Sequence, residues 1–146
     1  EKSGATVPQE DAMQSFEMQA PPAESEFMIF LTKTSETSCT AVYPLPRAIK
    51  FTGDVDLKSM LETLIKGPTQ EELSQGFRTN LNSAIDLETI IVHEGNIVDV
   101  VLREPNAPPP HTACELMRIR TQIESTLRQF PGADTVHISL NGIPIP

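Results

Sequence analysis

Residues 87–102 read LETIIVHEGNIVDVVL and contain two apolar segments separated by a short polar turn. Both segments, 87–93 and 97–102, are rich in Ile, Leu and Val, which favour β-strands. Gly95 lies between them and can adopt the positive φ that a tight turn requires. This stretch therefore predicts a β-hairpin, and the other elements are interpreted around it.

Residues 54–66 have the periodicity of a helix that buries one face. Their apolar residues recur at i, i+3, i+4, i+7 and i+8, which places them on a single stripe. The stripe consists of Leu57, Met60, Leu61, Leu64 and Ile65. Gly67 supplies a left-handed residue after the helix, and Pro68 prevents its continuation.

Two capping-box patterns predict further helix starts. Thr69 is followed by Glu72, and Thr112 is followed by Glu115. In each pair the hydroxyl can accept the amide of the third helical residue, while the carboxylate accepts the amide of the threonine. The first pattern predicts a short helix that ends near Gly76, and the second predicts a long helix over 112–129.

Three other segments are predicted from composition. Residues 27–33 form a compact apolar run and predict a buried strand, and residues 135–140 predict a strand followed by a turn at Asn141-Gly142. Residues 39–51 contain two prolines, so we expect irregular structure that ends in a short strand. The order predicts an α+β fold with a mixed or antiparallel sheet of about four strands and two main helices packed on one face.

The chain divides into an acidic, proline-rich linker or tether at 1–26 and a folded domain at 27–146. Its formal net charge is −9, which argues against a nucleic acid partner because phosphate binding needs clustered Lys and Arg. No apolar run approaches the length that spans a bilayer. Since the chain begins at Glu1, we expect membrane contact only through an upstream anchor that has been removed.

Several segments together resemble the sporulation and spore-germination (GerMN, "germane") domain family. These segments are 61–72, 76–79, the hairpin at Gly95, 123–131 and 136–142, so the resemblance covers nearly all of 27–143. The residues that carry it are Gly67, Pro68, Thr69, Glu72, Gly76, Gly95, Gln129, Phe130, Asn141 and Gly142.

The resemblance implies an extracytoplasmic domain of a lipoprotein or anchored bacterial protein that takes part in envelope or spore-related assemblies. We therefore expect a non-catalytic binding module whose partners are other extracytoplasmic proteins or peptidoglycan. The alternative is a sensor domain that holds a small, muropeptide-like ligand between helix and sheet. No cofactor is expected.

Cys39 and Cys114 are the two cysteines of the chain. In an oxidising compartment they can form a disulfide, which would stabilise the fold by constraining the unfolded chain. Two inert thiols are a second interpretation. The third is a thiol enzyme in which Cys114 is the nucleophile and His111 the base, because a cysteine in the first turn of a helix has a stabilised thiolate.

The remaining charged and metal-binding residue types give weaker signals. His93, His111 and His137 lack the spacing of a metal site, so no metal is expected. Arginines predict a possible surface for an acidic partner, with a solvated helix face as the simpler interpretation. These arginines are Arg47, Arg118, Arg120 and Arg128.

Overall fold

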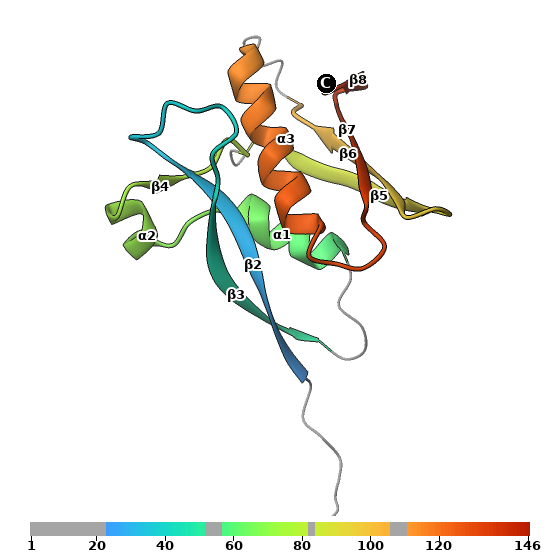
Figure 1. Cartoon of the computed structure of the whole chain (residues 1–146), viewed down its shortest axis with the longest axis horizontal. Helices are drawn as coiled ribbons and strands as arrows, with labels where there is room; N and C mark the ends of the chain where they lie inside the picture. Colours follow the sequence, from blue (N-terminus) through green and yellow to red (C-terminus); the bar gives the residue numbers. More distant parts are fainter. Residues whose placement is uncertain (1–22, 52–56, 82–83, 106–110) are drawn as a thin grey trace, which may run out of the picture. The chain divides into compact units, whose positions relative to one another are not determined.

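The computed structural model describes residues 23–51, 57–81, 84–105 and 111–146 (Figure 1). The chain divides into two compact units, one of Glu1–Ser25 with Ile49–Asp54 and the other of Glu26–Ala48 with Val55–Pro146. The second unit contains the buried hydrophobic core. Residues 1–22, most of the predicted linker, lie outside the described part of the chain.

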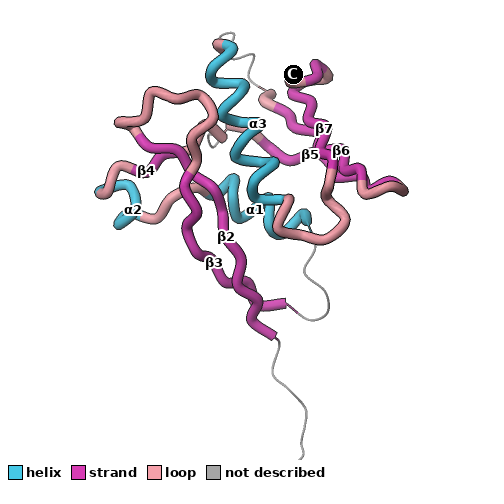
Figure 2. The backbone as a smooth tube through the Cα atoms, in the orientation of Figure 1, coloured by secondary structure: helices cyan, strands magenta, loops and turns pink. Residues whose placement is uncertain are grey.

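A four-stranded sheet in the order β5-β6-β7-β8 forms around the predicted hairpin (Figure 2). Its strands are β5 (Asp86–His93), β6 (Ile97–Arg103), β7 (Thr135–Leu140) and β8 (Ile143–Pro144). β6 and β7 run parallel and the other neighbours run antiparallel, so the sheet is mixed. The predicted fold class and hairpin are confirmed.

The hairpin turn uses the predicted glycine together with its neighbour. Gly95 has φ +83° and Asn96 has φ +62°. Both residues are in the left-handed region, within the three-residue loop 94–96 that joins the paired residues His93 and Ile97. Asn tolerates this conformation better than other non-glycine residues, which explains the Gly-Asn pair.

Helices α1 (Leu57–Lys66) and α3 (Ala113–Leu127) supply the other half of the core. Leu57, Met60, Leu61 and Leu64 of α1 are buried, as the predicted stripe requires. From α3, Ile119, Ile123 and Leu127 are fully buried. They face the alternate residues that β6 and β7 direct inward, which are Val98, Val100, Leu102, Val136, Ile138 and Leu140.

A three-stranded sheet in the order β3-β2-β4 lies outside the single sheet that the sequence predicted. It consists of β2 (Ala23–Lys33), β3 (Tyr43–Phe51) and β4 (Phe77–Arg78), and α2 (Gln70–Ser74) precedes β4. β2 begins four residues before the predicted start at 27. The expectation of irregular structure is confirmed for residues 39–42 and was wrong for 43–51, where an edge strand accommodates Pro44 and Pro46.

α3 is joined to β2 by buried polar side chains as well as by apolar packing. Gln122 is fully buried, donates from Nε2 to the carbonyl of Phe30 at 3.1 Å, and accepts the amide of Asn80 at 3.0 Å. Thr126 is also fully buried and accepts the amide of Phe30 through Oγ1. These bonds satisfy backbone groups of two other segments in the interior.

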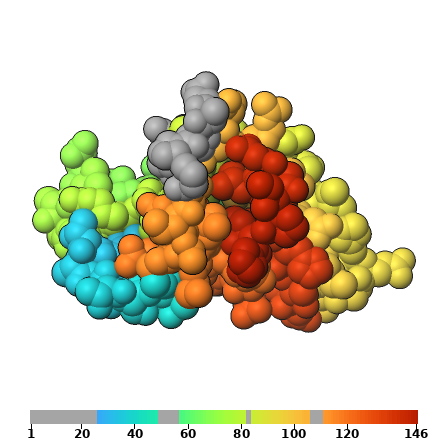
Figure 3. Space-filling view, turned by 90° about the horizontal axis from the view of Figure 1, so that it is seen from above, coloured from blue at the N-terminus to red at the C-terminus, as the bar shows by residue number. Residues whose placement is uncertain are grey.

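The C-terminal residues return to the four-stranded sheet. Asn141 has φ +52° and Gly142 has φ +83°, and β8 then pairs with β7. The side chain of Ile145 is buried, and the Ile145 amide donates to Ile138 at 2.8 Å. Figure 3 shows this C-terminal end (dark red) at the surface next to α3 (orange), where Arg120 donates to the carbonyl of Ile145.

Candidate binding site

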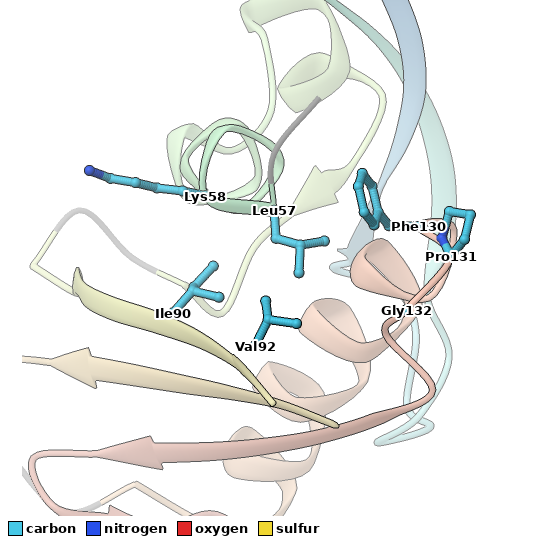
Figure 4. A pocket seen from close by; sticks show the side chains of 7 residues that line it. All are labelled: Leu57, Lys58, Ile90, Val92, Phe130, Pro131 and Gly132. Carbon is cyan, nitrogen blue, oxygen red and sulfur yellow. The ribbon is translucent and has the colours of Figure 1, made fainter. Parts of the chain in front are cut away.

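An apolar hollow of about 340 Å³ lies between α1, β5 and the loop that follows α3 (Figure 4). Its lining residues are Leu57, Lys58, Ile90, Val92, Phe130, Pro131 and Gly132. In Figure 4 the side chains of Leu57, Ile90 and Val92 point toward one another, whereas the ammonium end of Lys58 points away. The hollow therefore offers apolar carbon surface to a ligand or partner.

Three separate features of the sequence create this hollow. Leu57 begins α1 with its side chain in the core, so the first turn of the helix forms one wall. Pro131 and Gly132, with φ +104° at the glycine, turn the chain after α3 and form another wall. Ile90 and Val92 lie on the same face of β5, which is the third wall.

The hollow is accessible because β5 is an edge strand. Val92 is 60% exposed and Ile91, on the other face, is 45% exposed. In the strand order β5 has β6 as its neighbour on one side and no strand on the other among the described residues. A second hollow, of about 320 Å³, lies farther along the contact between α1 and β5 and is lined by Glu62, Ile65, Ile85, Asp86 and Leu87.

Cys39 and Cys114 form the predicted disulfide, with their Cα atoms 5.2 Å apart. The bond ties the loop between β2 and β3 to the first turn of α3. It occupies both thiols of the chain, so a thiol enzyme would require a reduced protein. The proposed base, His111, lies with Nε2 2.8 Å from the buried carboxylate of Glu104.

The family-motif residues that follow α1 determine the course of the backbone there. Gly67 has φ +79°, and a Cβ built there would lie 3.2 Å from Cγ2 of Thr79. Pro68 follows it, and Gly76 has φ +95° at the end of the next turn. The capping box of Thr69 and Glu72 is present in full.

Two motif side chains bind backbone groups of residues that are distant in sequence. The amide of Gln129 accepts the N–H of Met28 at 2.7 Å and donates to the Met28 carbonyl. Asn141 bonds both backbone groups of Glu104 in the same way, at 2.8 and 3.1 Å. Of the ten motif residues, Phe130 is the one that lines the hollow.

The four arginines are not gathered on one surface. Arg47, on β3, donates to both carboxylate oxygens of Glu72 at 2.6 and 2.8 Å. These hydrogen bonds hold the pKa of Glu72 below its ordinary value of 4.5. Arg118, Arg120 and Arg128 lie on or just after α3, where Arg118 donates to the Glu36 carbonyl. Their role in binding an acidic partner stays a prediction.

Arg120 and Arg128 share one carboxylate. Glu124 lies 3.1 Å from Arg120 and 3.6 Å from Arg128, each at i, i+4 spacing. Arg120 also donates to the carbonyls of Val136 and Ile145. The guanidinium of Arg120 therefore joins α3 to the four-stranded sheet, whereas Arg128 is more than half exposed.

Two histidines lie near one carboxylate on the outer face of the four-stranded sheet. Asp99 lies 2.8 Å from His93 Nε2 and 3.5 Å from His137 Nδ1. Within the described residues, no group of three or more His, Cys, Asp or Glu side chains is arranged to hold a metal ion. None of the described helices is long and apolar enough to cross a membrane.

The sequence by itself does not mark Leu57, Ile90 and Val92 as a site. Its one local signal was the run Ile90-Ile91-Val92, where three consecutive apolar residues place apolar side chains on both faces of a strand. A strand at the margin of a sheet exposes some of them. The contribution of Phe130 and Gly132 depends on tertiary packing.

Comparison with known proteins shows the family to which the chain is matched. Residues 28–146 match the family model Germane, described as sporulation and spore germination. The first GerMN domain of the sporulation protein GerM from Bacillus subtilis matches with a TM-score of 0.55 and 17% identity, over 84% of this chain and 89% of that domain.

The tandem GerMN domains of the same Bacillus subtilis protein match with a TM-score of 0.56 and 15% identity. The match covers 89% of this chain and 43% of the tandem structure, so this chain spans less than half of it. At these identities the likeness shows the fold alone. No curated protein sequence matches.

Proposed function

Because the chain belongs to the Germane family of sporulation and spore germination domains, we propose that it is a non-catalytic binding module that assembles with other proteins of the bacterial envelope. The observation that carries this proposal is the apolar hollow beside the exposed edge strand β5. Val92 is 60% exposed, so a partner that enters the hollow would contact its side chain.

The chemistry of the hollow favours a protein partner over a carbohydrate polymer. Its walls are the side chains of Leu57, Ile90, Val92 and Phe130, and the one charged residue, Lys58, points away. A glycan buried there would leave hydroxyl groups without hydrogen-bond partners, which is costly. A branched or aromatic side chain gains free energy from the same surface.

The disulfide supports an extracytoplasmic location. Disulfides persist in oxidising compartments and are rare in the cytosol. Cys39 and Cys114 close a loop across 75 positions of sequence, so the bond constrains much of the chain. The proposed location is therefore outside the cytoplasm, where an anchored or secreted protein meets envelope partners.

A small-ligand sensor is the second candidate, because about 340 Å³ lies within the usual size range of ligand pockets. The apolar lining makes a muropeptide a poor fit, so this candidate requires an apolar ligand. A ligand that binds the folded protein raises its thermal midpoint. A midpoint that rises when an apolar small molecule is added to the original protein, and does not rise for Val92→Asp, would favour the sensor.

Site-specific photo-crosslinking tests the binding proposal. A photoreactive amino acid is placed at Val92 or, as a matched control, at Met117, which is 44% exposed on α3. In cells that make the protein, we expect a discrete adduct of higher mass from position 92 and none from position 117. Absence of an adduct at 92, or identical adducts from both positions, would contradict the proposed site.

A further inference from the structure

Within the described residues the two sheets have four edges, and three of these edges carry features that oppose pairing with another strand. β4 and β8 are two residues long, and β8 also contains Pro144. β3 contains Pro44 and Pro46. Short edge strands and prolines are the usual means by which proteins prevent edge-to-edge association.

β5 is the edge that lacks these protections. It has eight residues and no proline. Its first part is irregular, because the register with β6 shifts between Leu87 and Thr89. From Thr89 to His93 the pairing with β6 is continuous, so this stretch presents a regular edge. An exposed, regular and apolar edge is a template for an added strand.

The hollows described above lie on the inner side of this edge. Residues 90 and 92 line the larger one, and residues 85–87 line the smaller one. Successive side chains of an added strand would point to opposite faces of the sheet. Every second side chain of such a strand would therefore lie over α1, next to Ile90 and Val92.

The charges around this edge indicate which charged residues a partner segment would carry. Asp86, Glu88 and Glu94 are exposed at the two ends of the regular stretch. A second copy of this chain is a poor occupant, because antiparallel self-pairing centred on Ile91 brings Glu88 of each copy near Glu94 of the other. Like charges across a strand pair are destabilising, and opposite charges stabilise.

From these observations we infer that the 89–93 edge of β5 binds an extended segment of a partner protein in which alternating apolar residues are flanked by Lys or Arg. The segment extends the four-stranded sheet by one strand, its apolar side chains enter the hollows, and its basic residues lie near Glu88 and Glu94. The inference rests on the proposed binding function and specifies the partner's chemistry.

Peptide binding to the full chain tests this inference. The probe is the peptide KVTVTVTVK, and its matched control is EVTVTVTVE, with affinities measured by fluorescence anisotropy. We expect the lysine peptide to bind at least about tenfold more tightly, with the preference reduced by salt. Backbone amide NMR signals of residues 89–93 should shift. Equal affinities, or no binding of the lysine peptide, would overturn the inference.

N-methylated versions of the lysine peptide separate strand addition from simple filling of the hollow. A strand pairs with its neighbour through the N–H groups of alternate residues. N-methylation of one alternate set should therefore reduce affinity at least about tenfold, while methylation of the other set should have little effect. Equal effects of both sets would overturn strand addition.

The two proposals fail in distinguishable ways. If position 92 cross-links to a partner in cells but KVTVTVTVK does not bind, the binding function stands and the basic strand is excluded. If the peptide binds at 89–93 and no cross-link forms in cells, the edge has the inferred chemistry and the proposed function is overturned.

Discussion

At the scale of single residues, the side-chain amide of Gln122 connects α3 to two other segments of the chain. It is fully buried and bonds the Asn80 amide, the Phe30 carbonyl and the Thr79 hydroxyl. Its loss would leave an N–H and a C=O at half-buried positions without partners, at a cost of about 1–3 kcal/mol each. One side chain thus stabilises the contact of α3 with β2 and with the segment after β4.

We predict that Gln122→Ala lowers the free energy of unfolding by about 3 kcal/mol, measured by urea denaturation. Gln122→Leu keeps most of the side-chain volume but makes no hydrogen bonds, so it should be almost equally destabilising. Ser125→Ala, at a half-buried position of the same helix, is the control and should change stability by less than about 0.5 kcal/mol. If Gln122→Leu were as stable as the original protein, the loss of stability in Gln122→Ala would result from the lost side-chain volume and not from the lost hydrogen bonds.

Glu72 couples a helix cap to an ion pair. Its carboxylate accepts the Thr69 amide and both guanidinium N–H groups of Arg47. The arginine hydrogen bonds lower the pKa of Glu72 from 4.5 in the folded state. A carboxyl whose pKa is lower when folded contributes stability above its unfolded pKa. That contribution is lost as the pH falls through the folded pKa.

The predicted consequence is that Glu72→Gln costs about 1–2 kcal/mol near neutral pH, because the amide can cap but cannot form the ion pair. The difference from the original protein should shrink as the pH falls below 4.5 and the carboxyl protonates. Urea denaturation across this range measures it, with Glu71→Gln on the exposed side of α2 as the control. A difference that is independent of pH would argue against the ion pair.

At the scale of elements, the disulfide fixes the loop between β2 and β3 to the start of α3. The Cys39–Cys114 bond spans 75 positions, for which the chain-entropy model gives about 4 kcal/mol. We predict that Cys39→Ser combined with Cys114→Ser lowers the free energy of unfolding by about this amount. Reduction of the original protein should have the same effect. If the native protein takes up alkylating reagent without reduction, the bond is absent.

The elements that the sequence predicted are those with local signals. α1, α3 and the β5–β6 hairpin each carry a full periodic pattern, and both capping boxes lie where Thr precedes Glu by three residues. The strand predicted at the end of 39–51 is longer than expected, because one edge strand accommodates both prolines. Alternate residues direct N–H groups to the same edge, so Pro44 and Pro46 remove donors from one edge and leave the other for β2.

The candidate site could not be predicted in the same way, because no local pattern defines it. Leu57, Val92 and Phe130 come from three elements far apart in sequence, and only the packing of α1 and α3 against the sheet brings them together. β4 and β8, at two residues each, are too short for a periodic signal. The paired cysteines were predictable because there were only two of them.

At the scale of the whole molecule, the net charge of −9 and the open edge of β5 have opposite effects on association. An apolar edge favours pairing with any strand, including a second copy, whereas acidic residues at its ends oppose self-pairing. In the register centred on Ile91, Glu88 and Glu94 of two copies approach each other at two symmetric places. The acidic ends thus keep the edge available for a different partner.

This balance predicts that one substitution converts the edge into a self-association site. Glu88→Lys would place an ammonium near Glu94 of a second copy at both symmetric positions, so two repulsions become two attractions. We expect the original chain to be monomeric in sedimentation equilibrium and Glu88→Lys to dimerise at least about tenfold more tightly, with a dissociation constant that rises with salt. Glu71→Lys, which makes the same charge change on α2, should stay monomeric. If both variants dimerise, the dimerisation results from the change in net charge and not from pairing of the β5 edges. If Glu88→Lys stays monomeric, the bulge at Leu87–Thr89 already prevents self-pairing.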